Sequence, residues 1–347
     1  MNRYRLALAA AAAVIAAAVI LTIVRQPTPA TRSSGGNGAL FPASERIAAP
    51  EFIGLDGWVN SPPLSIAGLH GHVVLIDFWT FSCVNCVRTL PHLQELYSAY
   101  RGYGFVLVGV HSPEFDFEKN RENVAAAVRR LEVTWPVALD SSMATWGAYN
   151  NRYWPAEYLI DQNGRVAYVH FGEGDYDVTD GAVARLLGVH APAGAAPTPS
   201  PAPMTPELYA GSQRGQLADG AGYGGIGRPV AYADHGPPRT ADLIQVTGTW
   251  IDQGQYLQAA RPGHVRLRFQ ASDVYVVAGT SAGPLAVTVQ LDGSAPPAPL
   301  YGPDLAAAGF SVTRQDLYHL VAHESAGYHL IDLAVPAGFQ LYTFTFG

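Results

Sequence analysis

The sequence holds two cysteines, Cys83 and Cys86, separated by Val84 and Asn85. A scaffold held by disulfides would need more cysteines spread along the chain, and a zinc site would need further ligands at suitable spacing. Cys83 follows an apolar run at 72–79 and lies where a helical pattern starts. Free backbone N–H groups and the positive end of a helix dipole favour a thiolate there. The spacing therefore predicts disulfide exchange, in which Cys83 attacks a partner disulfide and Cys86 resolves the mixed disulfide; the alternative is an inert structural pair.

The elements that must position this pair alternate between strands and helices. The sequence predicts, in order, a strand at 72–79, a helix at 86–101, a strand at 105–110, a helix at 117–131, a strand at 135–139, a short helix at 144–149, a hairpin of strands at 158–160 and 166–171, and a last helix that Thr179 or Asp180 caps and that ends at Leu187. Parallel strands need helical crossovers, and the hairpin adds antiparallel strands at an edge. This order predicts an α/β domain with a mixed sheet of four or five strands and helices on both faces.

The run VVLIDFWTFSCVNC resembles the active-site segment of thioredoxins. The resemblance implies that Asp77 is a buried acid that relays the proton of Cys86, and burial in an apolar strand would raise the pKa of such an acid. The alternative for Asp77 is a strand acid that faces solvent. Trp79 matches the family's aromatic residue before the motif and either shields the cysteines or packs in the core. Pro155, just before EYLID, matches the cis-proline that packs against the cysteines in this fold.

Longer segments narrow the resemblance. WTFSCVNCVRTLPHL, VGVHSPEFDFE, NRYWPAEYLID and HFGEGDY resemble the extracytoplasmic region of DipZ proteins, a branch of the TlpA-like thioredoxins, over roughly 48–190. TPELYAG and the β-rich region after it are similar to the C-terminal part of the same family, which implies a carbohydrate-binding-module-like jelly roll. DipZ proteins usually carry a multi-span electron-transfer membrane domain as well. This sequence has one apolar segment, so the resemblance leaves its electron donor open.

Composition shifts divide the chain into five parts. The sequence predicts a signal anchor at 1–26, a flexible linker at 27–47, the thioredoxin-like domain at 48–190, a Pro/Ala/Gly-rich linker at 191–240 and an all-β sandwich at 241–347. Short β-like runs separated by turns argue for the sandwich or jelly roll. Its aromatic residues either stack on sugar rings or pack between strands; these are Trp250, Tyr256 and Tyr275.

The first part of the chain has the pattern of an exported protein. Arg3 and Arg5 precede an apolar run at 6–24, which Arg25 closes. A bilayer-spanning helix needs about 20 apolar residues, whereas a cleaved signal has a shorter core. The pattern favours a single transmembrane helix that anchors the chain on the periplasmic or cell-wall side, because basic residues stay inside. If the segment is cleaved, the protein is secreted.

The overall charge excludes several classes of function. The chain has 347 residues, 14% of them charged, a net charge of −7 and one lysine, Lys119. Nucleic acid is therefore not expected as a partner, because phosphate binding needs clustered cations. His319 and His323 have the spacing of a zinc pair, but the surroundings are β-like and offer no third ligand, so we expect surface or hydrogen-bonded histidines. No metal or cofactor is predicted.

These observations predict an enzyme, a thiol–disulfide oxidoreductase that acts on exported protein thiols and disulfides. Strong oxidants of this fold stabilise the reduced thiolate, often with a His inside the motif, and neither a His nor a cation separates Cys83 from Cys86. The absence favours a reductant over an oxidant, and a reductant requires a separate membrane electron donor. Two alternatives are a thiol peroxidase of the peroxiredoxin type, which would need Pro and Arg beside Cys83, and a binding protein that acts through the β-sandwich.

Overall fold

The computed structural model describes residues 40–190, 204–280 and 282–347. Residues 40–347 belong to one compact unit, which contains an α/β lobe and a β-rich lobe. The signal anchor predicted at 1–26 lies outside the described residues. No helix within the described ranges has the length and apolarity to cross a membrane.

The α/β lobe is built on a mixed sheet. Its strands lie in the order β1 (Trp58–Val59), β4 (Val137–Leu139), β3 (Phe105–His111), β2 (Val73–Trp79), β5 (Ala156–Ile160) and β6 (Val166–Phe171). Strands β2, β3 and β4 are parallel, while β1, β5 and β6 are antiparallel to their neighbours. Every residue of the central strand β2 is buried, because both faces of the sheet are covered. The predicted mixed sheet is confirmed, with the short edge strand β1 in addition.

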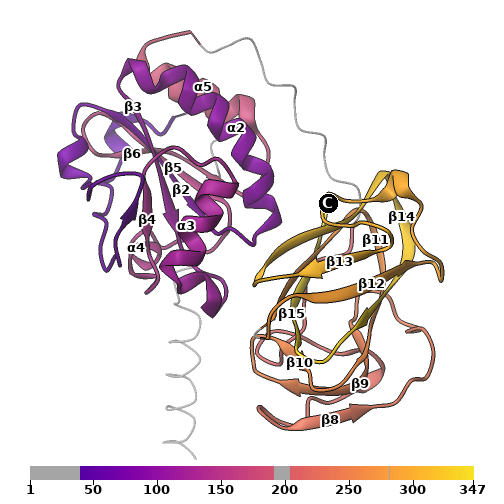
Figure 1. The fold of residues 1–347 in the computed structure, drawn as a ribbon. Coiled ribbons are helices and arrows are strands. Elements are labelled where there is room, and N and C mark those ends of the chain that lie inside the picture. The colour runs from indigo at the N-terminus through magenta and orange to yellow at the C-terminus, as the bar shows by residue number, and fades with distance from the viewer. Residues whose placement is uncertain (1–39, 191–203, 281) are drawn as a thin grey trace, which may run out of the picture. The chain divides into compact units, whose positions relative to one another are not determined.

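Helices cover the two faces unequally (Figure 1). Side chains of α2 (Val84–Tyr100), α3 (Arg121–Arg130) and α5 (Tyr176–Leu187) pack on the face that carries Val73, Leu75 and Trp79. The short helix α4 (Ala144–Ala148) and residues of the N-terminal segment pack on the face that carries Val74, Ile76 and Phe78. The helix at the cysteines therefore lies over the same face of the sheet as the odd-numbered residues of β2.

Two predicted helix boundaries were wrong. The helix expected at 117–131 is a 3-10 turn at Asp116–Lys119 followed by α3, because Asn120 leaves the helical conformation and its side chain accepts a hydrogen bond from the N–H of Asn123 at 3.0 Å. The last helix begins at Tyr176, not after a cap at Thr179 or Asp180. Asp175, in the left-handed conformation with φ 48°, is the residue that precedes it.

The β-rich lobe is a single sheet that closes on itself. Its strands are β7 (Leu208–Tyr209), β8 (Pro229–Tyr232), β9 (Gln245–Asp252), β10 (Leu257–Ala259), β11 (Gly263–Thr280), β12 (Leu285–Leu291), β13 (Gly309–Val312), β14 (Asp316–Val335) and β15 (Phe339–Phe346). Strand β11 pairs with both β15 and β9, and β10 bridges these two, so the four strands form a small barrel. Strands β14, β12 and β13 extend the sheet from the other edge of β11. The lobe is β-rich as predicted.

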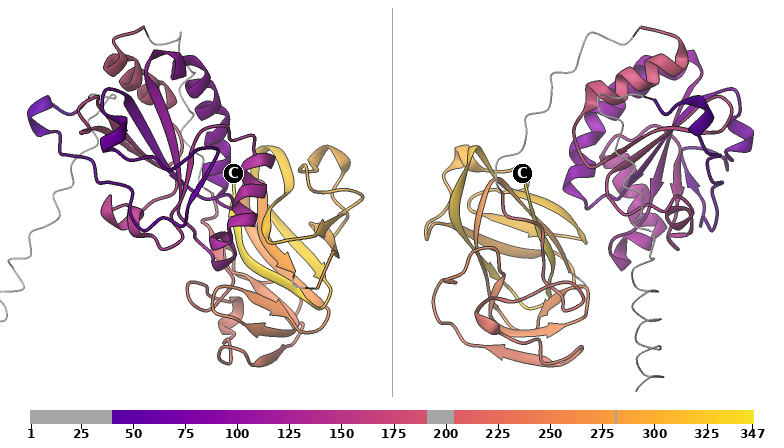
Figure 2. Two further views of the ribbon diagram at one scale, coloured as in Figure 1. Left: turned by 60° about the vertical axis from the view of Figure 1, so that its left-hand side comes forward. Right: turned by 180° about the vertical axis from the view of Figure 1, so that it is seen from behind.

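The β-rich lobe differs from the predicted sandwich of two stacked sheets, because its strands form one sheet. Strands β11 and β14, of 18 and 20 residues, are too long for one layer of a small sandwich. Their pairing is interrupted at Ala271/Asp273 and Val274/Tyr275, and such β-bulges bend a strand and increase its twist. Figure 2 shows the curved strands of this lobe in orange and yellow. Sequence periodicity showed the strands but not the bends that let one strand take part in both the barrel and its extension.

The segment 205–240, expected to belong to a linker, contributes strands to this sheet. Strand β7 pairs with β15, and β8 pairs with β9. Gly residues are frequent here, and several adopt positive φ, so the alternating pattern of a strand is short and interrupted.

Aromatic side chains of the two lobes pack against each other. Tyr342 of β15 lies against Phe115 and Phe117 of the α/β lobe at ring-centroid distances of 5.2 and 4.9 Å.

Candidate active site at the cysteine pair

Cys83 is the N-cap residue of α2. Its backbone is extended, with φ −80° and ψ 114°, and its Sγ accepts a hydrogen bond from the N–H of Cys86 at 3.2 Å. Both cysteines are free thiols in this structure; Cys83 is half-buried and Cys86 is 1% exposed. The predicted position of Cys83 at a helix start is confirmed. The reachable sulfur is thus the one that faces backbone N–H groups, and its partner lies beneath it.

Cys86 needs help to lose its proton. Burial raises the pKa of the Cys86 thiol well above its usual value, and the hydrogen bond to Cys83 and the negative charges of Cys83 and Asp77 raise it further. A thiol attacks a disulfide only as thiolate. The geometry therefore calls for a base close to Cys86.

Asp77 occupies the place where such a base is needed. It lies on β2, on the face that α2 covers, and is 2% exposed, so the alternative of a solvent-facing acid was wrong. Burial, followed by the charge of Glu157, raises the pKa of Asp77 well above its ordinary value. Its Oδ1 has no hydrogen-bond partner within the described part of the chain. The environment fits a carboxylate that takes up a proton; the catalytic role itself stays a prediction.

Trp79 and the proline before β5 are the two remaining candidate residues near the pair. Trp79 is fully buried and belongs to the same core cluster as Cys86, with its ring edge against His111 at 5.4 Å. The peptide bond between Trp154 and Pro155 is cis, as predicted. Trp154 donates from its indole Nε1 to the carbonyl of Ser112 at 3.0 Å and lines a pocket together with Cys83. Trp79 thus packs in the core next to the cysteines, and Trp154, which precedes Pro155, lines the pocket of Cys83.

Sequence reasoning missed a third acid, Glu118, which holds the loop before Cys83. Its carboxylate accepts hydrogen bonds from the hydroxyls of Thr80 and Ser82 at 2.5 and 2.6 Å. The backbone N–H groups of Glu114 and Phe115 donate to its other oxygen at 2.7 and 2.9 Å. Burial raises the pKa of Glu118 to about 7. The polar Thr80 and Ser82 inside an apolar run were the available signal, because buried hydroxyls need partners.

A pocket of about 260 Å³ opens beside Cys83. Residues of both lobes line it: Cys83, Val84, Asn85, Glu114, Arg152, Tyr153, Trp154, Glu207, Tyr209, Arg214 and Thr345. Glu114 accepts hydrogen bonds from the Tyr209 hydroxyl and from Arg214, each at 2.8 Å. The β-rich lobe therefore supplies part of the wall around Cys83, which sequence reasoning did not anticipate.

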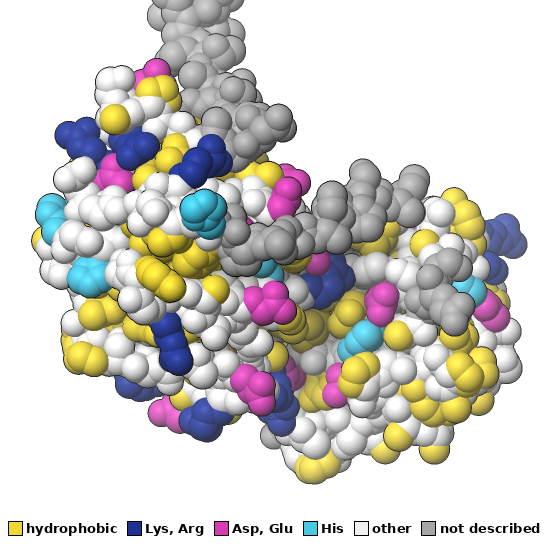
Figure 3. Space-filling model, turned by 90° about the horizontal axis from the view of Figure 1, so that it is seen from above, with side chains coloured by type: hydrophobic (Ala, Val, Ile, Leu, Met, Phe, Trp, Pro, Cys, Tyr) yellow, Lys and Arg dark blue, Asp and Glu magenta, His cyan; other side chains and the backbone are white. Residues whose placement is uncertain are grey.

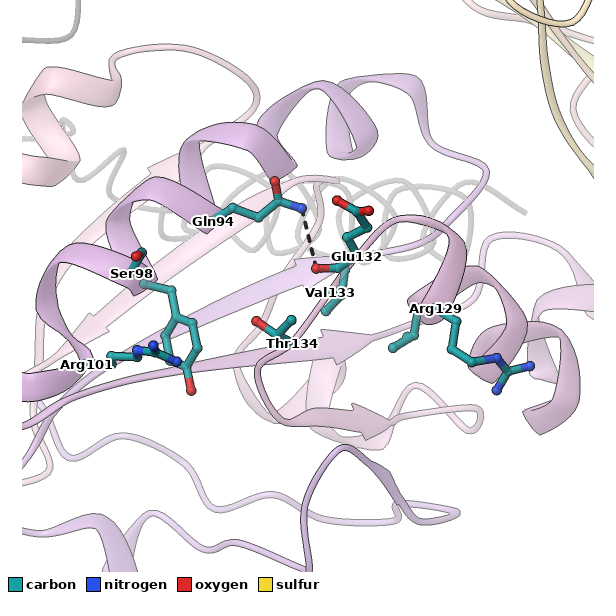
Figure 4. A pocket seen from close by; sticks show the side chains of 9 residues that line it. Gln94, Ser98, Arg101, Arg129, Glu132, Val133 and Thr134 are labelled. Carbon is teal, nitrogen blue, oxygen red and sulfur yellow. Dashed lines mark hydrogen bonds between the residues drawn. The ribbon is translucent and has the colours of Figure 1, made fainter.

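The larger hollow, of about 590 Å³, lies away from the cysteines. Figure 4 shows its lining side chains, which come from α2, the 3-10 turn at Arg101–Tyr103, α3 and the loop after α3. Gln94 crosses it and donates to the carbonyls of Leu131 and Glu132 at 3.2 and 3.5 Å. No cysteine lines this hollow, so we do not connect it with the redox chemistry.

The other candidate residues of the sequence lie elsewhere. His319 is on strand β14, where its Nε2 lies 2.8 Å from Asp273 and its ring stacks on Tyr275 at 4.0 Å, so the expected hydrogen-bonded histidine is confirmed. Within the described ranges, no group of three or more His, Cys, Asp or Glu residues could hold a metal ion. Trp250 and Tyr275 are 1% and 9% exposed, which leaves little of either ring for a sugar.

The surface charges agree with the composition. In Figure 3 the Lys and Arg side chains are interspersed with acidic and apolar ones and form no broad basic patch on the face shown. Several Arg residues are engaged in ion pairs, among them Arg88 with Glu173 at 2.8 Å and Arg130 with Asp316 at 2.7 Å.

Comparisons with known proteins agree with this geometry. Residues 47–169 match the AhpC/TSA family, and residues 205–347 match the family described as thioredoxin like C-terminal domain. The Protein DipZ of Mycobacterium tuberculosis and that of Mycobacterium bovis are each 36% identical to the chain over 312 residues, which is 86% of this chain. The chain is a DipZ homologue. It spans 43% of the length of these two relatives.

Further relatives match a smaller part of the chain. The thiol-disulfide oxidoreductase YkuV of Bacillus subtilis is 26% identical over 142 residues, which is 41% of this chain and 95% of that protein. The thiol-disulfide oxidoreductase ResA of Halalkalibacterium halodurans is 28% identical over 109 residues, which is 31% of this chain and 59% of that protein. The α/β lobe is therefore homologous to thiol–disulfide oxidoreductases, and the pair Cys83–Cys86 is its CxxC motif.

Proposed function

We propose that the chain is an extracytoplasmic thiol–disulfide oxidoreductase that reduces disulfides of exported proteins. The observation that carries the proposal is the arrangement of the two sulfurs. Cys83 caps α2 at the edge of a pocket, and Cys86 lies buried beneath it with the N–H of Cys86 on the Cys83 sulfur at 3.2 Å. Asp77 lies buried on the strand that leads to them.

The chemistry follows from these positions. The thiolate of Cys83 attacks a disulfide R–S–S–R′, forms a mixed disulfide with R and releases R′ as a thiol. The thiolate of Cys86 then attacks the Cys83 sulfur, which forms the Cys83–Cys86 disulfide and releases R as a thiol. Two electrons pass from the protein to the substrate, and the protons of the two cysteines end on the two product thiols. In the second step Asp77 takes the proton of Cys86 and returns it to the leaving thiolate.

The surroundings of Cys83 support the direction of reduction. Within the described chain, the cation that follows closest on α2 is Arg88, and its guanidinium is engaged by Glu173 at 2.8 Å and by Asn85 at 2.7 Å. Arg152 and Arg214 also line the pocket of Cys83, where Arg214 is paired with Glu114 at 2.8 Å and Arg152 bonds to Asn150 and Asn151. We infer that the helix start is the main stabilising feature of the thiolate. A less stabilised thiolate means a more reducing couple, because strong oxidants owe their potential to a stabilised reduced form.

The location and partners are part of the proposal. Arg3, Arg5 and the apolar run at 6–24 support a membrane anchor with the domains on the periplasmic or cell-wall side. A reductant in that compartment needs electrons from a separate membrane donor. For the β-rich lobe we propose a carbohydrate-binding-module-like scaffold that walls the cysteine pocket, since Glu207, Tyr209 and Arg214 line it. The buried state of Trp250 argues against sugar stacking on that ring.

The test uses the full chain and its two single-cysteine variants. The reduced wild-type chain is mixed with a disulfide-containing protein, and free thiols and mixed disulfides are measured over time. Cys83→Ser abolishes turnover, whereas Cys86→Ser accumulates a mixed disulfide at Cys83. A Cys83→Ser chain that still reduces the substrate, or a Cys86→Ser chain that traps nothing, contradicts the mechanism.

Two further measurements separate the alternatives. Equilibration with glutathione gives the potential of the Cys83–Cys86 couple; a value near the strongly oxidising end, about −120 mV, would make the protein an oxidant. Consumption of hydrogen peroxide by the reduced chain tests the thiol peroxidase. The structure brings Arg152 and Arg214 to the pocket of Cys83, but Arg152 bonds to Asn150 and Asn151, and Arg214 bonds to Glu114. We therefore expect disulfide reduction to exceed peroxide consumption.

A further inference from the structure

A row of titratable side chains crosses three neighbouring strands behind Cys86. Asp77 on β2 lies directly opposite Glu157 on β5, and Glu157 lies directly opposite His170 on β6. Directly opposite residues of antiparallel strands have Cβ atoms about 4.5–5.5 Å apart and point to the same face. For this row the shared face is the one that α2 and α5 cover. Glu157 is thus the immediate neighbour of the acid proposed to serve Cys86.

Both carboxyl groups are buried and lack a cation. Asp77 and Glu157 are each 2% exposed. No Lys or Arg of the described residues forms an ion pair with either one. Glu157 accepts one hydrogen bond, from the hydroxyl of Thr179 on α5 at 3.0 Å. Asp77 Oδ1 accepts none within the described part of the chain.

The other titratable groups on this face do not supply positive charge. From α2 come Cys86 and His92, and burial together with the nearby His170 lowers the pKa of His92 to about 4. From β6 come Tyr168 and His170, and burial also lowers the pKa of His170. Groups at the start of α5 add negative charge when they ionise: Asp175, Tyr176, Asp177 and Asp180. Tyr100 of α2 belongs to the same buried cluster, and burial and Asp180 raise its pKa. Arg88 of α2 is a cation, and it is paired with Glu173 at 2.8 Å.

Two buried carboxylates this close cannot both be ionised without a cation. Desolvation disfavours each charged form, and each negative charge raises the proton affinity of the other group. The outcome in such pairs is one proton held between two acids, which titrate as a unit. Burial raises the pKa of Glu157 to about 7, and the charge of Glu157 contributes to the raised pKa of Asp77.

We propose that Asp77 and Glu157 share one proton, and that Glu157 is a positioning residue that sets the proton affinity of Asp77. The inference rests on the proposed function, since it concerns the proton of the resolving step. In that step Asp77 takes the Cys86 proton as the Cys83–Cys86 bond forms and the bond from Cys83 to the substrate breaks. The proton then goes to the leaving substrate thiolate, and the pair returns to a single shared proton.

The test compares wild type with Glu157→Gln, which keeps an acceptor oxygen for Thr179 but carries no charge. The released substrate thiol is measured in single turnovers from a preformed mixed disulfide at a series of pH values. Without the charge of Glu157, Asp77 holds its proton less tightly, so the pH at which resolution is half-maximal falls by roughly one unit or more. Glu157→Asp keeps the charge and the wild-type midpoint. Circular dichroism checks that both variants are folded.

A second readout does not depend on turnover. Infrared difference spectra across the pH series show the protonated-carboxyl band of the pair in wild type, and Glu157→Gln moves the titration of this band to lower pH. A folded Glu157→Gln chain with an unmoved midpoint, including one that is slower by the same factor at every pH, overturns the shared proton. If wild type itself does not exchange disulfides, the proposed function fails, and the infrared titration still decides whether Asp77 and Glu157 share a proton.

Discussion

Two pairs of carboxyl groups flank the cysteines, one behind Cys86 and one in front of Cys83. Asp77 and Glu157 lie opposite each other in the sheet of the α/β lobe, with one hydroxyl as donor. Glu114 and Glu207 lie in the pocket wall, where the Tyr209 hydroxyl is 2.8 Å from one and 2.9 Å from the other, and Arg214 pairs with Glu114 at 2.8 Å.

The difference shows how the same residue type serves two purposes. In the front pair, Arg214 compensates a negative charge and its guanidinium also lies 3.7 Å from the centre of the Tyr209 ring, which ties the β-rich lobe to the site. In the rear pair no Lys or Arg of the described residues forms an ion pair with either carboxyl group, and we propose that a proton compensates the charge. The compensated member of the front pair is Glu114, whereas burial and the charge of Glu114 raise the pKa of Glu207 to about 7. The carboxylate with a cation holds a wall in place, and in the rear pair we propose that a proton remains available for chemistry.

The largest effect should come from the rear pair. Asp77→Asn removes the base for Cys86, and we expect resolution of the mixed disulfide at pH 7 to slow by roughly 100-fold or more, within the range of general-base catalysis. The measurement is the single-turnover release of substrate thiol. The matched control is Glu114→Gln in the front pair, for which the same step changes little. Equal slowing in both variants would remove the distinction between the pairs.

Glu118 is a buried carboxyl group that is surrounded by hydrogen-bond donors instead of a cation, and its protonation should make the stability of the chain depend on pH. Its folded-state pKa of about 7 lies above its ordinary value of 4.5, so the folded state binds the proton more tightly than the unfolded state. The stabilisation is complete below about pH 4.5 and is lost as the pH rises through 7. The free energy of unfolding of wild type should therefore fall between pH 4.5 and pH 8. In Glu118→Gln we expect this fall to be smaller than in wild type by about 1–3 kcal/mol.

Urea unfolding of the full chain at pH 4.5 and pH 8 measures this difference. These two pH values span the range between the ordinary pKa of Glu118, 4.5, and its folded-state pKa of about 7. Identical pH dependence in the variant and in wild type would mean that Glu118 is ionised in both states and that its hydrogen bonds from Thr80 and Ser82 suffice to replace a cation.

The smallest effect is expected in the front pair. Arg214→Met removes the compensating charge but keeps an apolar stem on the Tyr209 ring. The Arg214 side chain is 40% exposed, so its ion pair with Glu114 is partly screened. We expect the free energy of unfolding to fall by about 1 kcal/mol, with no change in the potential of the cysteine couple. A changed potential would show that the front pair also acts on Cys83 electronically.

The sequence was sufficient for the parts of the site that are local in the chain. Cys83, Cys86 and Asp77 lie within one strand–turn–helix, and Pro155 directly precedes a strand, so a short motif identifies them. Glu157 lies in the segment NRYWPAEYLID, but its importance comes from its position opposite Asp77 in the sheet. A single sequence does not determine which strands pair or in which register.

The β-rich lobe was harder to predict for a related reason. Its contribution to the pocket comes from Glu207, Tyr209 and Arg214, which lie in a Gly-rich segment without strong periodicity. The short strand β7 is held there by pairing with β15, more than a hundred residues later in the chain. Local propensity carries little information about contacts of this separation.

The cap of α2 links electron transfer to folding. The sulfur of Cys83 accepts a hydrogen bond from the N–H of Cys86 in the first turn of this helix, and it is the atom that we propose attacks the substrate. A helix cap contributes about 0.5–2 kcal/mol, so any change in the bonding of that sulfur alters the stability of the helix end. Reduced chain, oxidised chain and their unfolded forms make a thermodynamic cycle. The difference in unfolding free energy between the two redox forms must therefore equal the difference in reduction free energy between the folded and unfolded cysteine pair.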